Sequence, residues 1–368
     1  MPNPILKFPS NTCLAISNAH RHVKVYPSGV RSLVLFTVPS SFFTSPTITE
    51  KPFDLATSSG PLTAFPIPLL IKNIVTTGIL SGLGFLLFKY RESFYILQDL
   101  TFLQIISFST LVLFCIILSG SKLNQIASNF NIRLKKNEWL ALSSMTTILN
   151  SIFFKSGSLA TSTYLKKKYE FEYASFVGSF VGDQLIILFI ATLIGSFSSI
   201  FLIYYGNIQL FFIFITFLIV SIFLFTLLRG KITLTKKKDG ILEQLRIGTE
   251  SFNTLFQNKN LLYSLCAHNI FLFTAAAFRL FTACSVLHQE IPLIHCFLFV
   301  AVMSITRIIP IAHSDIGVRE ITVGLISETI GSGMKVGVLI TSIDRIFELL
   351  LTSLCLGIFR KSLVTSKV

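Results

Sequence analysis

The stretch Arg307-Ile-Ile-Pro310-Ile-Ala-His-Ser-Asp315-Ile-Gly317-Val-Arg319-Glu320 decides how the rest of this sequence is interpreted. It places four formal charges and a proline among long apolar runs. A charge near the centre of a bilayer costs a few kcal/mol or more, so charges kept there usually face a cavity or a partner. Because Pro310 removes a backbone donor and Gly317 permits a tight turn, we predict two short helices with a break between them. This stretch is therefore predicted to be a re-entrant hairpin and the main functional site.

The composition around this stretch is that of a membrane protein. The chain has 368 residues, of which 52% are hydrophobic and 13% charged, and its mean hydropathy is +0.73. Soluble domains carry about 25% charged residues. The net charge of +14 lies in short Lys and Arg blocks between apolar runs, which indicates cytoplasmic loops and contact with anionic lipid. Nucleic acid is not expected as a partner.

The apolar runs predict an all-α polytopic membrane protein with about six full transmembrane helices and two re-entrant helical hairpins. The first re-entrant segment is the short run Trp139–Phe154, because basic residues flank both of its ends. The second begins at Leu293 and includes the opening stretch. The basic loops favour a plasma (inner) membrane location with both termini cytoplasmic. The six predicted spans cover residues 70–88, 101–119, 177–197, 207–228, 261–284 and 336–359.

Five segments follow from this reading. They are a disordered or targeting-like tail (1–65), a first membrane repeat (66–230), a cytoplasmic amphipathic linker (231–260), a second membrane repeat (261–359) and a short basic cytoplasmic tail (360–368). The linker spaces its apolar residues like a helix that lies on the membrane, and a plain connecting helix explains it equally well.

The two hairpins have a common layout. Gly157 precedes Asp183 at nearly the same spacing as Gly317 precedes Asp344. The flanking charges make the first hairpin enter from the inside and the second from the outside. This pattern is typical of inverted repeats, which hold a substrate site near the midplane of the membrane.

Three motifs together resemble the transmembrane, flippase-like family of lysylphosphatidylglycerol synthases. They are Pro310-Ile-Ala-His-Ser-Asp-Ile-Gly-Val-Arg-Glu320, Lys155-Ser-Gly157 followed by Tyr164-Leu-Lys-Lys-Lys168, and Asp344-Arg345. The resemblance covers residues 70–359 and implies a protein that binds or translocates a lipid. Asp315 and Thr161 depart from the family pattern. Only the membrane part is matched, so synthase chemistry is not expected.

The candidate site is a set of charged and helix-breaking residues around the second hairpin. Arg319 suits a phosphate because guanidinium offers a planar pair of donors and stays charged when buried. Glu320 is expected to hold Arg345 or to receive a cationic headgroup. Asp344, Arg345 and Glu348 share one helix face and can meet the hairpin. The alternative is a purely structural ion network. The full set of lipid-headgroup candidates is Arg307, Pro310, Asp315, Gly317, Arg319, Glu320, Asp344, Arg345, Glu348 and Lys155.

Other residues are given plainer roles. Arg279 lies near the end of an apolar run and is predicted to snorkel to the interface. The six cysteines lie mostly in apolar runs without Cys-x-x-Cys spacing, so they are interpreted as buried small side chains. No metal site and no cofactor are expected.

The sequence thus favours a protein that binds or translocates an anionic lipid, either a phospholipid or a polyprenyl-phosphate-linked intermediate. Besides membrane lipids, a second copy of the chain or a lipid-biosynthetic enzyme is the expected partner. The alternative function is a membrane enzyme, or an accessory or scaffold subunit, in lipid or lipid-linked sugar biosynthesis. As an enzyme it would use Glu320 or Asp344 as a general base.

Overall fold

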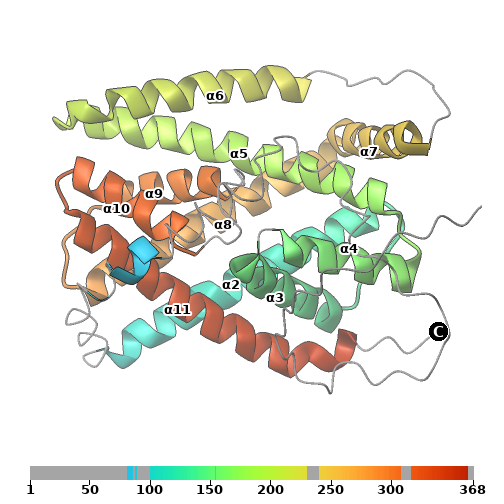
Figure 1. Cartoon of the computed structure of the whole chain (residues 1–368). Coiled ribbons are helices and arrows are strands. Elements are labelled where there is room, and N and C mark those ends of the chain that lie inside the picture. The colour runs from blue at the N-terminus through green and yellow to red at the C-terminus, as the bar shows by residue number, and fades with distance from the viewer. Residues whose placement is uncertain are drawn as a thin grey trace, which may run out of the picture. The chain divides into compact units, whose positions relative to one another are not determined.

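The computed structural model describes residues 81–85, 88, 100–153, 155–229, 240–307 and 316–363, with backbone alone at 240–245. These residues form helices and links, with no strand among them. The predicted N-terminal tail lies outside them, as does all of the first predicted span except helical residues 81–85 and residue 88. The described helices (Figure 1) are α2 (Phe102–Ser128), α3 (Lys136–Ile152), α4 (Ser156–Tyr169), α5 (Tyr173–Tyr204), η3 (Ile208–Leu210), α6 (Phe211–Arg229), α7 (Gly240–Gln257), α8 (Lys259–Val286), α9 (Leu293–Thr306), α10 (Val318–Thr329), α11 (Met334–Phe359) and η4 (Arg360–Leu363).

Four helical segments are long and apolar enough to cross a membrane. They are α2, α5, the η3–α6 segment and α8, each with at least 22 residues. At 1.5 Å per residue they exceed a hydrocarbon layer of about 30 Å. These segments confirm the helices predicted at 101–119, 177–197, 207–228 and 261–284. The predicted last span is the 26-residue helix α11, which is not among the four and carries Lys335, Asp344, Arg345 and Glu348.

The predicted hairpins are two pairs of short helices. The pair α3 and α4 has 17 and 14 residues, and the pair α9 and α10 has 14 and 12. Helices of these lengths span about 18–26 Å, less than the hydrocarbon layer. In the first pair, Thr146 bonds Thr161 and Gly157 bonds Asn150, so the two helices run antiparallel. The first pair thus folds as a helical hairpin with a turn at Lys155 (φ 59°). In the second pair, Arg319 at the start of α10 contacts Met303 near the end of α9, and the link between them at 308–315 lies outside the described residues.

Helices α2 and α8, which precede the two hairpins, pack against each other in opposite directions. Asn129 meets Asn258 at one end (3.1 Å), and Lys122 meets Asn269 further along (2.9 Å). Between them Ser264 donates to Gln125 over 2.8 Å. Helices at equivalent positions in the two predicted repeats therefore run antiparallel.

Helix α7 lies against α5. A Cβ built on Gly178 of α5 would stand 2.0 Å from the Gly248 carbonyl oxygen of α7, so the backbones touch at these glycines. Phe252 and Leu255 of α7 are buried. Because this apolar side is covered by protein, the packing favours the connecting helix over the membrane-surface helix.

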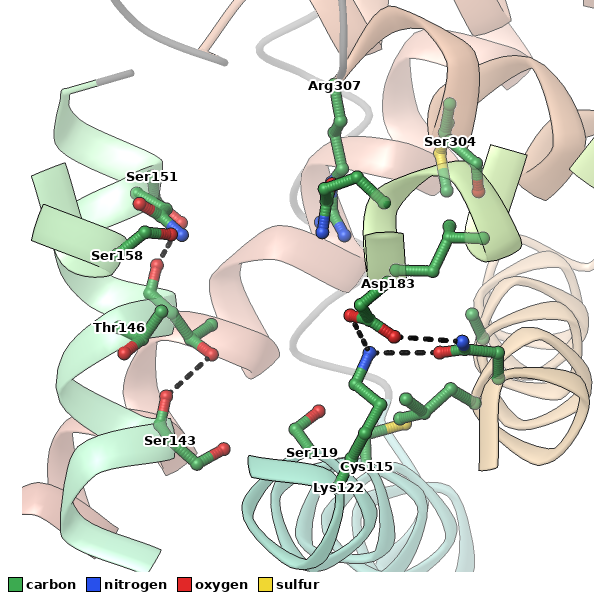
Figure 2. Close-up of a pocket in the computed structure, with 18 of the residues that line it drawn as sticks. Cys115, Ser119, Lys122, Ser143, Thr146, Ser151, Ser158, Asp183, Ser304 and Arg307 are labelled. Carbon is green, nitrogen blue, oxygen red and sulfur yellow. Dashed lines mark hydrogen bonds and ion pairs between the residues drawn. The ribbon is translucent and has the colours of Figure 1, made fainter. Parts of the chain in front are cut away.

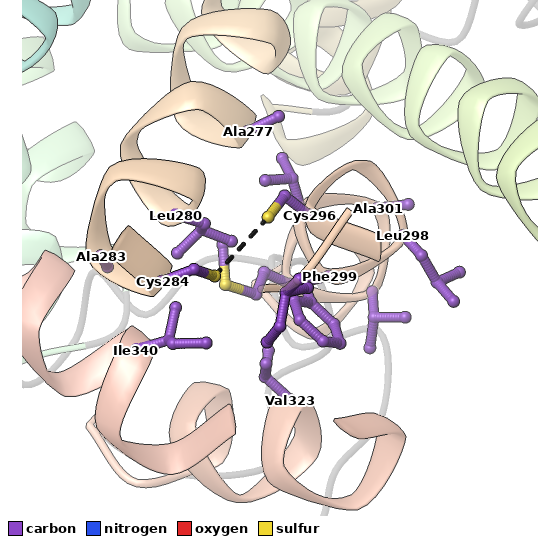
Figure 3. Packing of buried hydrophobic residues seen from close by; sticks show 14 of the residues in the cluster. Ala277, Leu280, Ala283, Cys284, Cys296, Leu298, Phe299, Ala301, Val323 and Ile340 are labelled. Atoms are coloured by element: carbon purple, nitrogen blue, oxygen red, sulfur yellow. Dashed lines mark hydrogen bonds between the residues drawn. The ribbon is translucent and has the colours of Figure 1, made fainter. Parts of the chain in front are cut away.

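The largest core lies among α8, α9, α10 and α11 (Figure 3). Phe299 is fully buried there, beside Val323 and Ile340. The thiols of Cys284 and Cys296 lie 4.0 Å apart and are free. The five cysteines that the structure describes are all free, and three of them are buried, which agrees with the sequence interpretation.

Candidate functional site

A cavity of about 380 Å³ lies between the two hairpins and is lined by α2, α3, α4, α5, α8, α9, α10 and α11 (Figure 2). Its walls are mostly apolar and also carry charged and hydroxyl side chains. The five basic side chains on its walls are those of Lys122, Lys155, Arg279, Arg307 and Arg319. The acidic side chains on its walls are Asp183 and Glu348. Asp344 lies behind them, in contact with two of the arginines.

Three buried charges, Arg279, Arg319 and Asp344, join α8, α10 and α11 on one side of this cavity, together with the partly buried Glu348. Arg279 of α8 grips Asp344 of α11 with two parallel bonds, Nε to Oδ1 at 2.7 Å and Nη2 to Oδ2 at 2.8 Å. Arg319 of α10 pairs with the same carboxylate and with Glu348 at 3.2 Å. Bidentate arginine–carboxylate pairs of this kind fix orientation strongly. Arg279 is 4% exposed, so the snorkelling interpretation does not describe it.

Arg319 has every side-chain nitrogen engaged. Its Nη2 bonds Asp344, its Nη1 bonds Glu348, and its Nε lies 3.0 Å from the Met303 sulfur. The side chain is 2% exposed. A phosphate would have to displace a carboxylate to reach it, and an arginine stripped of a buried partner is costly. The geometry favours the structural role of Arg319 over the headgroup role.

Glu320 pairs with Arg345 at 2.8 Å, as the sequence predicted. The same carboxylate accepts the backbone N–H of Gly317 at 2.8 Å and so fixes the first turn of α10. Gly317 has a φ of 90°, which favours glycine. None of these three residues lines the cavity, so they hold the hairpin in place. Pro310 and Asp315 lie outside the described residues.

Arg307 and Lys155 occupy equivalent places, each at the break of a hairpin. The Arg307 side chain is 50% exposed and lies 3.9 Å from Glu348. Lys155 donates to Gln184 over 3.2 Å and lies 5.0 Å from the centre of the Phe180 ring. Both line the cavity, so of the predicted site residues these two and Glu348 are best placed to meet a ligand.

A second ion pair, Lys122 with Asp183, lines the same cavity, and sequence reasoning missed it (Figure 2). Lys122 of α2 contacts Asp183 of α5 at 2.8 Å and Asn269 of α8 at 2.9 Å. Asn269 in turn donates to the other Asp183 oxygen at 3.1 Å. An acid inside an apolar run needs a cation, so Asp183 indicated that a basic partner exists without identifying it as Lys122.

Thr161, which departs from the family pattern, is buried on α4 and shares a 2.6 Å bond with Thr146 of α3. Among the described residues, no group of three or more His, Cys, Asp or Glu side chains is arranged to hold a metal ion. Comparisons with protein-family models, curated proteins and solved structures found no match to this chain. The resemblance noted in the sequence therefore stays a prediction.

Proposed function

We propose that this chain is a multi-pass membrane protein that binds an anionic lipid in the cavity and carries its headgroup across the bilayer. The observation that supports the proposal is the charge of the walls. Five basic side chains line the described cavity against two acidic ones, and Asp344 behind them leaves two basic charges in excess. A cavity whose charged side chains are mainly basic, within apolar helices, suits a phosphate whose acyl chains lie in lipid.

Arg307 and Lys155 are proposed to bind the phosphate. Lys155 stands at the turn between α3 and α4, and Arg307 ends α9; both side chains line the cavity. Arginine offers a planar pair of donors to phosphate, and lysine offers a mobile point charge. Arg279 and Arg319 are held by carboxylates and keep α8, α10 and α11 together.

An inverted repeat gives this protein a way to move the lipid. In each half a helix with a cation (α2 or α8) precedes a hairpin, and a helix with a paired aspartate (α5 or α11) follows it. The antiparallel packing of α2 and α8 is what two inverted repeats would produce. We propose that the two repeats rock about this contact. The hairpins would then enter the membrane from opposite sides without crossing it, and both termini would be cytoplasmic.

Reconstituted vesicles test the function. Translocation of headgroup-labelled phosphatidylglycerol and phosphatidylcholine would be compared for the wild type, an Arg307→Gln, Lys155→Gln double variant and an Arg360→Gln control. Arg360 is exposed on η4 and does not line the cavity. We expect preference for the anionic lipid, with at least about a tenfold loss in the double variant because charged hydrogen bonds contribute roughly 1.5–3 kcal/mol each. Equal movement of both lipids, or full activity of the double variant, would refute the proposal.

The enzyme alternative finds less support in the geometry. Glu320 and Asp344, its candidate general bases, are each paired with arginine and do not line the cavity. A general base must reach the proton that it removes. An observed product from purified protein and a lipid-linked sugar would nevertheless favour that alternative.

A further inference from the structure

One wall of the cavity carries polar side chains that have no charge. They lie on α3 and α4, the first hairpin, opposite Arg307 and the Lys122–Asp183 pair (Figure 2). The positions on α3 recur at the spacing of a single helix face. The side chains of this hydroxyl wall are those of Thr146, Thr147, Asn150, Ser151, Ser158 and Thr161.

We propose that the headgroup held in this cavity bears hydroxyl groups as well as its negative charge, so that the ligand is a lipid whose phosphate carries a sugar or another polyol. This inference rests on the proposed function, because it assigns the rest of a headgroup whose phosphate that function places near Arg307 and Lys155. The hydroxyl wall is separate from the two basic side chains that are proposed to bind the phosphate.

The bonding state of the hydroxyl wall points to a hydroxyl-bearing partner. Thr147 donates to the Ser143 carbonyl at 3.0 Å, and Ser151 donates to the Thr147 carbonyl at 2.9 Å. The Thr147 hydroxyl has thus engaged its proton, and its oxygen remains an acceptor. The phosphodiester group of a lipid has no proton to donate and so cannot donate to an oxygen such as that of Thr147. A ligand hydroxyl can, because it donates.

Ser158 gives independent evidence that a hydroxyl of this wall lacks a hydrogen-bond partner. Its side chain is buried, with 7% of the residue exposed, and its Oγ has no hydrogen-bond partner although it lines the cavity. Burying a hydroxyl without a partner costs roughly 1–3 kcal/mol. An ammonium group would also donate to this wall, but the excess of basic side chains around the cavity repels it. A neutral polyol can donate hydrogen bonds to the hydroxyl wall, and the basic side chains do not repel it.

The size of the cavity agrees with one such headgroup. Small-molecule sites occupy roughly 300–1,000 Å³, and this cavity, at about 380 Å³, is near the lower limit. It therefore suits a phosphate and one compact polar group between the charged and hydroxyl walls.

The experiment compares lipids of equal charge. Binding of phosphatidylinositol, which has five free hydroxyls, and of phosphatidylmethanol, which has none, would be measured for the full chain in phosphatidylcholine nanodiscs. We expect about a tenfold preference for phosphatidylinositol. Removing the Ser158 hydroxyl (Ser158→Ala) should reduce this preference about threefold, the effect of one hydrogen bond.

Ser144→Ala is the matched control. Ser144 lies on the same hairpin, is fully buried and also has an unpartnered Oγ, but it does not line the cavity. The preference should be unchanged in this variant. Thr147→Val, which keeps the shape and removes a second wall hydroxyl, should lower the preference even if Ser158→Ala fails to fold.

The outcomes separate the two proposals. If both anionic lipids bind equally and more tightly than phosphatidylcholine, the polyol assignment is wrong and the proposed function stands. If neither binds more tightly than phosphatidylcholine, the proposed function itself is wrong. If soluble inositol 1-phosphate binds as tightly as phosphatidylinositol, the ligand is a free phosphate ester and the lipid assignment is overturned.

Discussion

Asp344 should be far more important for stability than Glu348, although the two lie one helical turn apart on α11. Asp344 is 1% exposed and holds two arginines, with bonds of 2.7 and 2.8 Å to Arg279 and a further pair with Arg319. Glu348 is 13% exposed, lines the cavity and stands 3.2–3.9 Å from three arginines. The buried carboxylate is therefore the centre of the cluster.

Asp344→Asn keeps the side-chain volume but turns one acceptor into an NH₂ group that faces two guanidinium groups. Breaking a buried ion pair from one side costs about 3–5 kcal/mol. For a chain of this size 1 kcal/mol corresponds to about 2 °C, so the melting temperature should fall by roughly 6–10 °C. Glu348→Gln should lower it by no more than about 3 °C, because water in the cavity reaches this carboxylate.

Thermal unfolding in detergent, followed by intrinsic tryptophan fluorescence, measures both shifts at one heating rate. Glu290→Gln is the control, because Glu290 is an exposed carboxylate in the link between α8 and α9 and its substitution should change stability by less than about 0.5 kcal/mol. Equal shifts for Asp344→Asn and Glu348→Gln would refute the assignment of the cluster's centre. A wild-type melting temperature for Asp344→Asn would show that the cluster does not stabilise the fold.

Three further substitutions test other contacts. Gly157→Ala should destabilise the first hairpin by about 1–3 kcal/mol, since the new Cβ would lie 2.2 Å from the Thr146 carbonyl oxygen; faster proteolysis between α3 and α4 would report it. Glu138→Gln should cost about 2 kcal/mol, because this 1%-exposed carboxylate accepts from two tyrosine hydroxyls and lies 3.2 Å from the Lys168 ammonium; a melting curve unchanged from wild type would contradict this. Asp183→Asn should weaken the α2–α5 contact at Lys122 by about 2 kcal/mol or more, and a Lys122→Met, Asp183→Leu double variant should recover part of the loss in the same melting assay.

Local features of the sequence predicted much of this fold. Apolar runs located the long helices, and the short run Trp139–Phe154 corresponds to the 17-residue helix α3, which is not among the four segments long enough to cross. The pairing of Glu320 with Arg345 was one of the two roles that opposite charge suggested for Glu320. These features depend on residues close in the chain, where periodicity and charge carry the information.

The partners of the other charges were not predictable in the same way. Arg279 and Asp344 lie 65 residues apart, and their contact depends on which faces of α8 and α11 meet. Without that contact Arg279 resembles a snorkelling residue, and Arg319 resembles a free phosphate ligand. Lys122 was hidden for a similar reason, because it follows an apolar run and is indistinguishable from a loop cation until α5 packs beside it.

The antiparallel contact of α2 with α8 has a consequence for how the polypeptide can be divided. Helices of the second half complete the surroundings of the first, since α9 packs on α5, α11 on α3, and Asn269 completes the Lys122–Asp183 pair. The cavity described above takes its walls from both halves. Two fragments separated between α6 and α7 and produced in the same cell should reassemble into one working protein, whereas either fragment alone should be degraded.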